Sequence, residues 1–184
     1  MKIKLITTFL CALLTVPSLH AQIKDKGFFV EMNAAYGQQY IDIDGGVNER
    51  EGYAILMPAI GYQFNSRWAA GFRMKFDTRN SNFTTYSPYV QYNFLRWKKV
   101  KVFAEGQLAL SYPKDDEWND NYTEAGISFG ASYVLCNHIS FMLRYLYIGY
   151  STDPYRNEGA YLGNGRLVLD ANTRRLQLGI QITF

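Results

Sequence analysis

The feature that most constrains this chain is an alternation of apolar and polar residues with a period of 2, which recurs from Gly27 to the last residue. In the first segment Phe28, Val30, Met32, Ala34 and Tyr36 form one face, and Phe29, Glu31, Asn33, Ala35 and Gly37 form the other. No stretch after Gly27 longer than a turn or two prefers the helical period of 3.6. Because successive side chains of a strand point to opposite faces, the pattern predicts an all-β fold.

Eight segments carry this alternation. We expect eight antiparallel strands, at residues 27–38, 52–64, 68–77, 84–94, 100–112, 122–134, 139–150 and 172–184. Short turns follow the second, fourth and sixth strands, whereas the longer connections are 39–51, 78–83, 113–121 and 151–171. In an up-and-down barrel the short turns then gather at one end and the long loops at the other, which is typical of transmembrane barrels.

The N-terminus predicts a secretory signal peptide. Lys2 and Lys4 precede an apolar run at 5–16, and cleavage is expected after Ala21. The barrel domain would then span residues 22–184.

Composition excludes two other classes of protein. Aromatic residues make up 16% of the chain, far more than disordered segments carry. After the N-terminal segment there is no run of roughly 20 apolar residues, so the chain is not a helical membrane protein with several spans. The net charge of +3 is too small to indicate binding of nucleic acid.

The apolar face could point outward to lipid, or inward as in a soluble lipocalin-like barrel. The polar face consists of Gly, Ala, Ser, Asn and Gln with scattered charges, whereas a soluble exterior is normally rich in Lys and Glu. The apolar face keeps its large side chains without a charge, as contact with lipid requires. We therefore predict a transmembrane barrel with a polar lumen.

An internal repeat marks the second and fourth strands. Residues 58–64 and 88–94 share the pattern Pro-x-β-branched-x-Tyr-x-Phe, and each is followed by a short turn. The repeat predicts an aromatic belt at one membrane interface, made of Tyr62, Phe64, Tyr92 and Phe94. Because proline cannot donate to a ladder, we expect a local defect or a bulge at Pro58 and Pro88.

The last strand ends on an aromatic residue. Its apolar face consists of Leu176, Leu178, Ile180, Ile182 and Phe184. With the signal, the eight alternating strands and the two kinds of connection, this chain resembles the small, porin-like outer-membrane β-barrels of Gram-negative bacteria, of the OmpA-barrel and OmpX type. The resemblance covers the mature chain. It implies an outer-membrane location, contact with outer-membrane lipid and lipopolysaccharide, and a C-terminal signal read by the barrel-assembly machinery.

Ionisable residues are few on the polar face: Glu31, Arg73, Lys75, Lys101, Glu105, Glu124 and Arg144. Counted from the short-turn end, Arg73, Glu105 and Arg144 each fall about six residues into their strands. An eight-stranded barrel is just wide enough for its side chains to fill, and charges enclosed there must pair. We hypothesise a network centred on Glu105 that plugs the lumen. The alternative is that water fills the gaps and solvates each charge separately.

Two expected loops are acidic, with Asp42, Asp44, Glu49 and Glu51 in the first and Asp115, Asp116, Glu117 and Asp120 in the third. Carboxylates can bind Ca²⁺ or Mg²⁺, but the ligand spacing of a calcium loop is absent, so we expect solvated loops, no metal and no cofactor. The fourth loop combines Tyr155, Arg156 and Tyr161 with glycines, which suits contact with an extracellular ligand.

Three functions remain open. We favour a non-enzymatic structural or surface-interaction role with a filled lumen, and the first alternative is a passive channel for small or apolar solutes. The third is a lipid A-modifying enzyme, because His138-Ile139-Ser140 is similar to the His-x-Ser of lipid A deacylases. His138 falls in an expected turn at the opposite end from that group's active site, so we expect no catalysis.

Overall fold

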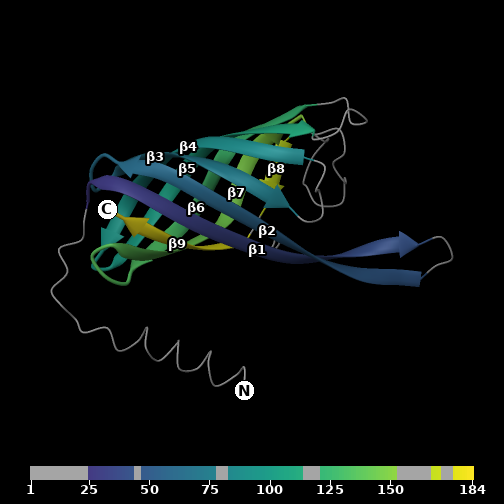
Figure 1. The fold of residues 1–184 in the computed structure, drawn as a ribbon, viewed down its shortest axis with the longest axis horizontal. Coiled ribbons are helices and arrows are strands. Elements are labelled where there is room, and N and C mark those ends of the chain that lie inside the picture. Colours follow the sequence, from purple (N-terminus) through teal and green to yellow (C-terminus); the bar gives the residue numbers. More distant parts are fainter. Residues whose placement is uncertain (1–24, 44–46, 78–82, 114–120, 153–166, 171–175) are drawn as a thin grey trace, which may run out of the picture.

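The computed structural model describes residues 25–43, 47–77, 83–113, 121–152, 167–170 and 176–184 (Figure 1). Side chains are described for these residues except 37–53, 77, 168 and 170. Within the described ranges no helix is long and apolar enough to cross a membrane. The predicted signal peptide lies outside them and stays a prediction.

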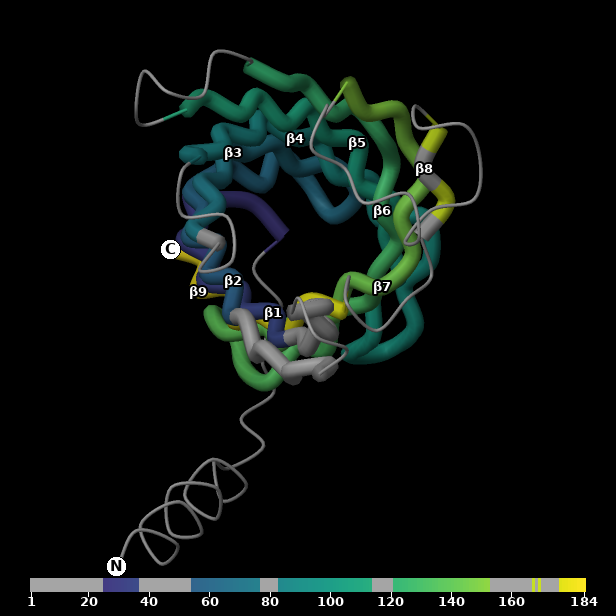
Figure 2. Tube along the Cα trace, turned by 90° about the vertical axis from the view of Figure 1, so that its right-hand side faces the viewer, coloured from purple at the N-terminus to yellow at the C-terminus, as the bar shows by residue number. Residues whose placement is uncertain are grey.

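The strands form one closed antiparallel sheet. They are β1 (Gly27–Ile43), β2 (Val47–Gln63), β3 (Trp68–Asp77), β4 (Phe83–Trp97), β5 (Val100–Pro113), β6 (Tyr122–Val134), β7 (Ile139–Ser151), β8 (Leu167–Asp170) and β9 (Gln177–Thr183). Each of the strands β1 to β7 pairs with the next one in the chain, and β9 closes the ring between β7 and β1. Figure 2 shows the strands surrounding a central space. The predicted eight-stranded up-and-down barrel is confirmed.

The eighth position of the barrel is shared by two strands. β9 pairs with the first half of β7, and β8 pairs with Tyr147 to Tyr150 in its second half. β9 begins at Gln177, after the expected start at residue 172, and residues 171–175 lie outside the described residues. β8 lies within the expected loop 151–171. The four residues of β8 become a strand because they pair with the part of β7 that β9 leaves unpaired. The sequence pattern alone could not reveal this pairing.

The first hairpin is longer than predicted. β1 and β2 remain paired as far as Ile43 and Val47, so most of the expected loop 39–51 is strand. The predicted acidic loop is wrong in the same way, because Asp42, Glu49 and Glu51 lie on these strands and Asp44 is outside the described residues. Figure 1 shows the hairpin running out past the other strands. The other acidic cluster, and Tyr155, Arg156 and Tyr161 of the fourth loop, lie outside the described residues.

Both prolines lie inside strands without a bulge. Pro58 faces Met32 of β1 and Pro88 faces Phe72 of β3, and the register is the same before and after each proline. On its other edge each proline coincides with a gap in the ladder, toward β3 for Pro58 and toward β5 for Pro88. The missing N–H donor therefore interrupts one ladder and leaves the register intact. Of the two expectations, the local defect is confirmed and the bulge is wrong.

Bulges occur instead at two positions that carry no proline. β4 continues past its predicted end at residue 94 to Trp97, and its bulge residue is Phe94, which has no partner on β5. A bulge shifts the following residues by one place, so each faces the opposite side. Arg96, which strict alternation would send to the outer face, is thereby paired with Lys101 on the lumen side.

The second bulge lies in β7 at Tyr145. Before it, Met142 and Arg144 are buried in the lumen, and after it Tyr147 and Ser151 are. The change in parity places a long charged side chain and a large ring on the same inner side, three residues apart.

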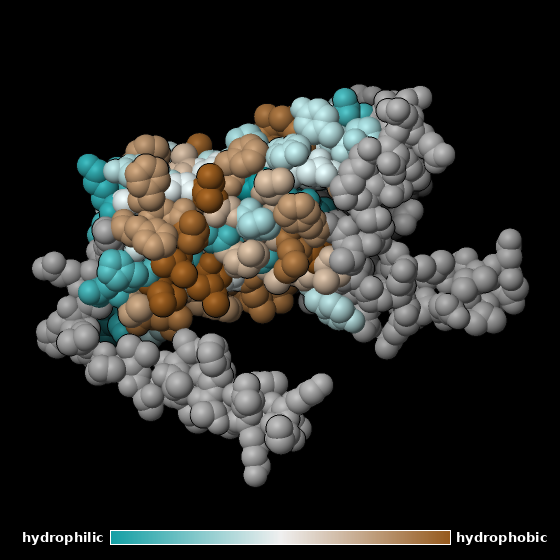
Figure 3. Space-filling view, viewed as in Figure 1, coloured by the Kyte–Doolittle hydropathy of each residue, from teal (hydrophilic) through white to brown (hydrophobic). Residues whose placement is uncertain are grey.

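The apolar face of the barrel points outward, as predicted. Large exposed side chains on the wall include Val30, Ile60, Phe72, Val90 and Ile127, each more than 40% exposed. Figure 3 shows apolar residues over much of the visible wall, with hydrophilic ones at the left edge and others among them and toward the upper right. An outer wall of this many exposed apolar side chains is stabilised by an apolar surrounding.

Candidate functional site

The middle of the lumen holds a buried charge cluster of four side chains, which we call the central cluster. Glu31 comes from β1, Arg73 from β3, Glu105 from β5 and Arg144 from β7, and all four are at most 4% exposed. Alternate strands of the barrel therefore each supply one charge at one level. Their inward direction follows from the alternation, and their common depth follows from the register of the sheet.

Arg73 and Glu105 form a two-pronged pair. Arg73 Nη1 donates to Glu105 Oε1 at 2.8 Å, and Arg73 Nη2 donates to Glu105 Oε2 at 3.1 Å. The second nitrogen also lies 3.4 Å from Glu31 Oε1. This parallel arrangement is the strongest ion-pair geometry that arginine makes with a carboxylate.

Arg144 completes the central cluster from the other side. Its Nε and Nη2 atoms donate to Glu105 Oε2 at 3.0 and 2.8 Å, and Nη2 also lies 3.0 Å from Glu31 Oε1. Its Nη1 atom donates to Asn33 Oδ1 at 2.9 Å. The central cluster thus contains two cations and two anions, so its formal charge balances without water.

Asn33 and two aromatic rings hold the central cluster in place. The amide of Asn33 donates to Glu31 and to the Met57 carbonyl oxygen, which lies 3.2 Å away. The Arg73 guanidinium lies 4.4 Å from the centroid of the Tyr89 ring, and the Arg144 guanidinium 5.3 Å from that of Phe103. The rings supply both cation–π attraction and walls that exclude water.

These rings lie against glycines on neighbouring strands. A Cβ atom at Gly71 would come 2.6 Å from the Tyr89 ring, and one at Gly130 would come 2.5 Å from the Phe103 ring. The same relation holds for Phe29 with Gly61 and for Tyr147 with Gly126. Each of these glycines on the polar face therefore leaves room for an inward-pointing ring on the neighbouring strand. The absence of a Cβ atom lets a narrow barrel hold both the rings and the arginines.

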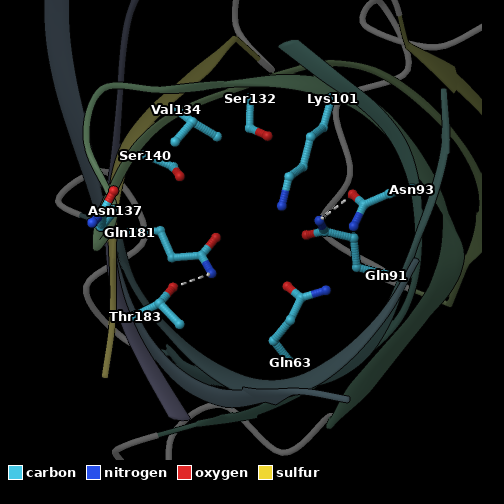
Figure 4. A pocket seen from close by; sticks show the side chains of 10 residues that line it. All are labelled: Gln63, Gln91, Asn93, Lys101, Ser132, Val134, Asn137, Ser140, Gln181 and Thr183. Atoms are coloured by element: carbon cyan, nitrogen blue, oxygen red, sulfur yellow. Dashed lines mark hydrogen bonds between the residues drawn. The ribbon is translucent and has the colours of Figure 1, made fainter. Parts of the chain in front are cut away.

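A polar pocket lies between the central cluster and the short turns (Figure 4). Side chains point into it from around the barrel, among them Gln63, Gln91, Lys101, Ser132, Ser140 and Gln181. The volume open to the centres of water molecules is ≈ 20 Å³, and one water needs roughly 10–15 Å³ on this measure. The pocket has room for a water molecule or two, and a larger solute does not fit.

The sequence predicts seven ionisable residues on the polar face. The structure brings four of them together as the central cluster. Lys101 lines the polar pocket, and Lys75 and Glu124 are half-buried nearer the long-loop end. Asn33, Tyr89 and Phe103 were missed by the sequence reasoning. A signal was available, since all three lie on the polar face. Asn33 and Phe103 are two strand positions from a charged residue, and Tyr89 is diagonal to Arg73 across the sheet.

The predicted aromatic belt lies on the outer surface near the short turns. Tyr62 packs edge-on against Phe28 with ring centroids 4.9 Å apart and contacts Phe64 at 5.3 Å. Tyr92 contacts Trp68 at 4.6 Å. The structure thus groups these rings with two neighbours that the repeat had not included.

The predicted assembly signal lies on β9 and the residues beside it. Leu178, Ile180, Ile182 and Phe184 face outward and are between 37% and 60% exposed, and Leu176 precedes the strand. Strand β9 is held on both edges, by β1 and by β7.

In the described part of the lumen, the buried carboxylates face arginines. Across the described residues no group of three or more His, Cys, Asp or Glu side chains is placed to hold a metal ion. The buried carboxylates are instead occupied by arginines at hydrogen-bond distance. The paired charges of the central cluster thus occupy the lumen at mid-height.

We compared the chain with known proteins and protein families. The structure of Neisserial surface protein A (NspA) is similar, with 18% sequence identity, a TM-score of 0.49 and coverage of 86% of this chain and 97% of that chain. No curated protein matches the sequence. The family model described as the outer membrane protein beta-barrel domain matches residues 9–184. This chain therefore belongs to the family of outer membrane β-barrel proteins.

Proposed function

We propose that the protein is a non-conducting outer-membrane barrel with a structural or surface-interaction role. The observation that carries this proposal is the central cluster, which fills the lumen at mid-height with paired charges. The outer face would contact outer-membrane lipid and lipopolysaccharide, and the long-loop end would offer the surface for an extracellular ligand. The signal peptide and the aromatic end of β9 suit export and insertion by the barrel-assembly machinery.

Recording of currents in planar bilayers tests closure. We expect no ion-conducting steps from the purified protein, because the central cluster fills the lumen at mid-height with side chains that are at most 4% exposed. In the double variant Glu105→Ala/Arg144→Ala, one anion and one cation are removed together, and steps are expected to appear. Val90→Ala, an outward change at the same depth, serves as the matched control and stays silent. Steps of similar size in the unaltered protein would favour the passive channel instead.

A pair of substitutions on one strand tests the lipid-facing wall. Val90 and Leu95 both point outward from β4 and are 49% and 54% exposed, but Val90 lies at mid-height and Leu95 beside the short turn. Arginine is expected to cost about 2–4 kcal/mol at the bilayer midplane and about 0–1 kcal/mol near an interface. Unfolding in urea from lipid vesicles should therefore show a much larger loss for Val90→Arg than for Leu95→Arg. Equal losses would mean that the wall does not face lipid.

We further propose that the barrel has no catalytic activity on lipid A. His138 lies in the turn before β7, where its Nδ1 atom is 2.7 Å from the Thr183 carbonyl oxygen. The backbone N–H of Thr183 in turn donates to the His138 carbonyl oxygen at 2.7 Å. These contacts support a role for His138 in tying the turn to β9. Mass spectrometry of lipid A from cells with and without the protein should show the same acyl chains.

A further inference from the structure

The chain just before β1 makes contacts on the far side of the barrel. Asp25 Oδ2 lies 2.7 Å from an amine nitrogen of Arg96 on β4, and Asp25 Oδ1 lies 3.6 Å from Nζ of Lys101 on β5. β1 itself pairs only with β2 and β9, so these partners belong to strands opposite to it in the ring. To reach them, residues 25–27 must lie across the mouth at the short-turn end.

Local structure explains how the chain turns into the mouth. Gly27 is the first residue of β1 and has a φ of 149°, a conformation that residues with a side chain rarely adopt. Figure 2 shows the purple start of the described chain leaving the ring of strands and pointing into its interior. Glycine therefore supplies the bend that directs Asp25 inward instead of along the line of β1.

The partner for Asp25 is also specifically placed. Arg96 is on the lumen side only because the bulge at Phe94 reverses the alternation of β4. Leu95 and Trp97, on either side of it, are more than half exposed on the outer wall. Two separate departures from regular strand geometry, the bend at Gly27 and this bulge, thus bring one carboxylate and one guanidinium together.

The contact adjoins the polar pocket through Lys101. Lys101 lines the pocket and is also the second cation beside Asp25. Its side chain is only 10% exposed, whereas Asp25 and Arg96 are each 36% exposed, so the pair lies at the outer rim and Lys101 below it. We propose that residues 25–27 form a strap that closes the short-turn mouth, locked by Asp25 on Arg96 and Lys101, and that release of the strap opens the pocket to solvent.

The test measures access to the pocket wall in the protein purified in detergent. Cys136→Ser removes the native thiol outside the predicted signal peptide, and Ser132→Cys places a new thiol on the pocket wall. The rate of modification by methyl methanethiosulfonate is compared in this background and after Asp25→Asn or Arg96→Gln. Each change is expected to raise the rate about fivefold, as expected for loss of a half-exposed ion pair that limits opening.

Lys26→Gln is the matched control, because it changes the charge of the exposed neighbouring residue in the same segment. Its rate should equal that of the background, and heat-modifiable migration on gels shows that each variant is folded. Unchanged rates in both Asp25→Asn and Arg96→Gln overturn the strap, as does an equal increase in Lys26→Gln. An increase in Arg96→Gln without one in Asp25→Asn also overturns it, because Asp25→Asn removes the contacts with both Arg96 and Lys101, whereas Arg96→Gln removes only one of them.

Discussion

Replacing Glu105 with glutamine is expected to destabilise the folded barrel by about 3–5 kcal/mol, the usual result of breaking a buried ion pair from one side. Glu105 is fully buried and accepts hydrogen bonds from both Arg73 and Arg144. The neutral amide would leave two buried guanidinium groups facing the single carboxylate of Glu31. The midpoint and slope of urea unfolding, followed by tryptophan fluorescence in detergent, measure the change in free energy.

Two further variants separate charge balance from general damage to the lumen. In Glu105→Gln/Arg144→Gln the remaining pair, Arg73 and Glu31, is again neutral in sum, so the double variant should be more stable than Glu105→Gln alone. Thr85→Val removes an uncharged lumen bond, the 2.7 Å contact with the Ser111 hydroxyl, and should cost only about 1 kcal/mol. If Glu105→Gln were no worse than Thr85→Val, the central cluster would not be held by its charges.

The second large effect is expected at a glycine. Gly130→Ala places a Cβ atom 2.5 Å from Phe103 Cζ and against the Leu143 carbonyl oxygen of the neighbouring strand. Phe103 is fully buried beneath Arg144, so the ring has no free space into which it can turn. The wall and the ring must both shift, and overpacking of this kind costs about 1–3 kcal/mol. The same unfolding measurement, with the yield of the heat-modifiable folded form, reports the loss.

Gly106 provides a matched comparison on the adjacent strand β5. An added Cβ there meets nothing within 4 Å, because this glycine points out of the barrel. Gly106→Ala should therefore be neutral or stabilise the barrel by about 0.5–1 kcal/mol, since alanine loses less conformational freedom on folding. A loss at Gly106 equal to that at Gly130 would show that any glycine in the wall is sensitive, and that the rings are not what distinguishes Gly130.

Taken together, the central cluster and its rings explain how such a narrow barrel can be filled without a conventional apolar core. The inward glycines make room for Tyr89 and Phe103, and the two rings exclude water from the central cluster. The exclusion of water strengthens the attraction between the charges. Each component depends on the others. This dependence is why single changes in the lumen are expected to cost more than changes of similar size on the wall.

The two faces of the barrel wall and the inward direction of the lumen charges could be predicted, because they depend on the alternation within single strands. A period of 2 fixes which residues share a face, so the outward apolar wall and the inward direction of Arg73, Glu105 and Arg144 follow from the sequence. Equal distances from the short turns also predicted that these three residues reach a similar depth. The rings were missed because a hydrophobic residue on the polar face looks like a defect until its neighbour across the sheet is known to be glycine.

The sequence by itself determined the eight positions of the barrel wall, the two faces of its strands and the charges that had to pair inside. Only the tertiary structure decided the bulges at Phe94 and Tyr145, the extension of the first hairpin, the joining of β8 and β9 on one edge, and the reach of Asp25 to Arg96. The physical reason is that alternation is a property of a single strand. Bulges, shared edges and contacts across a mouth depend on which partner each strand meets when the sheet closes.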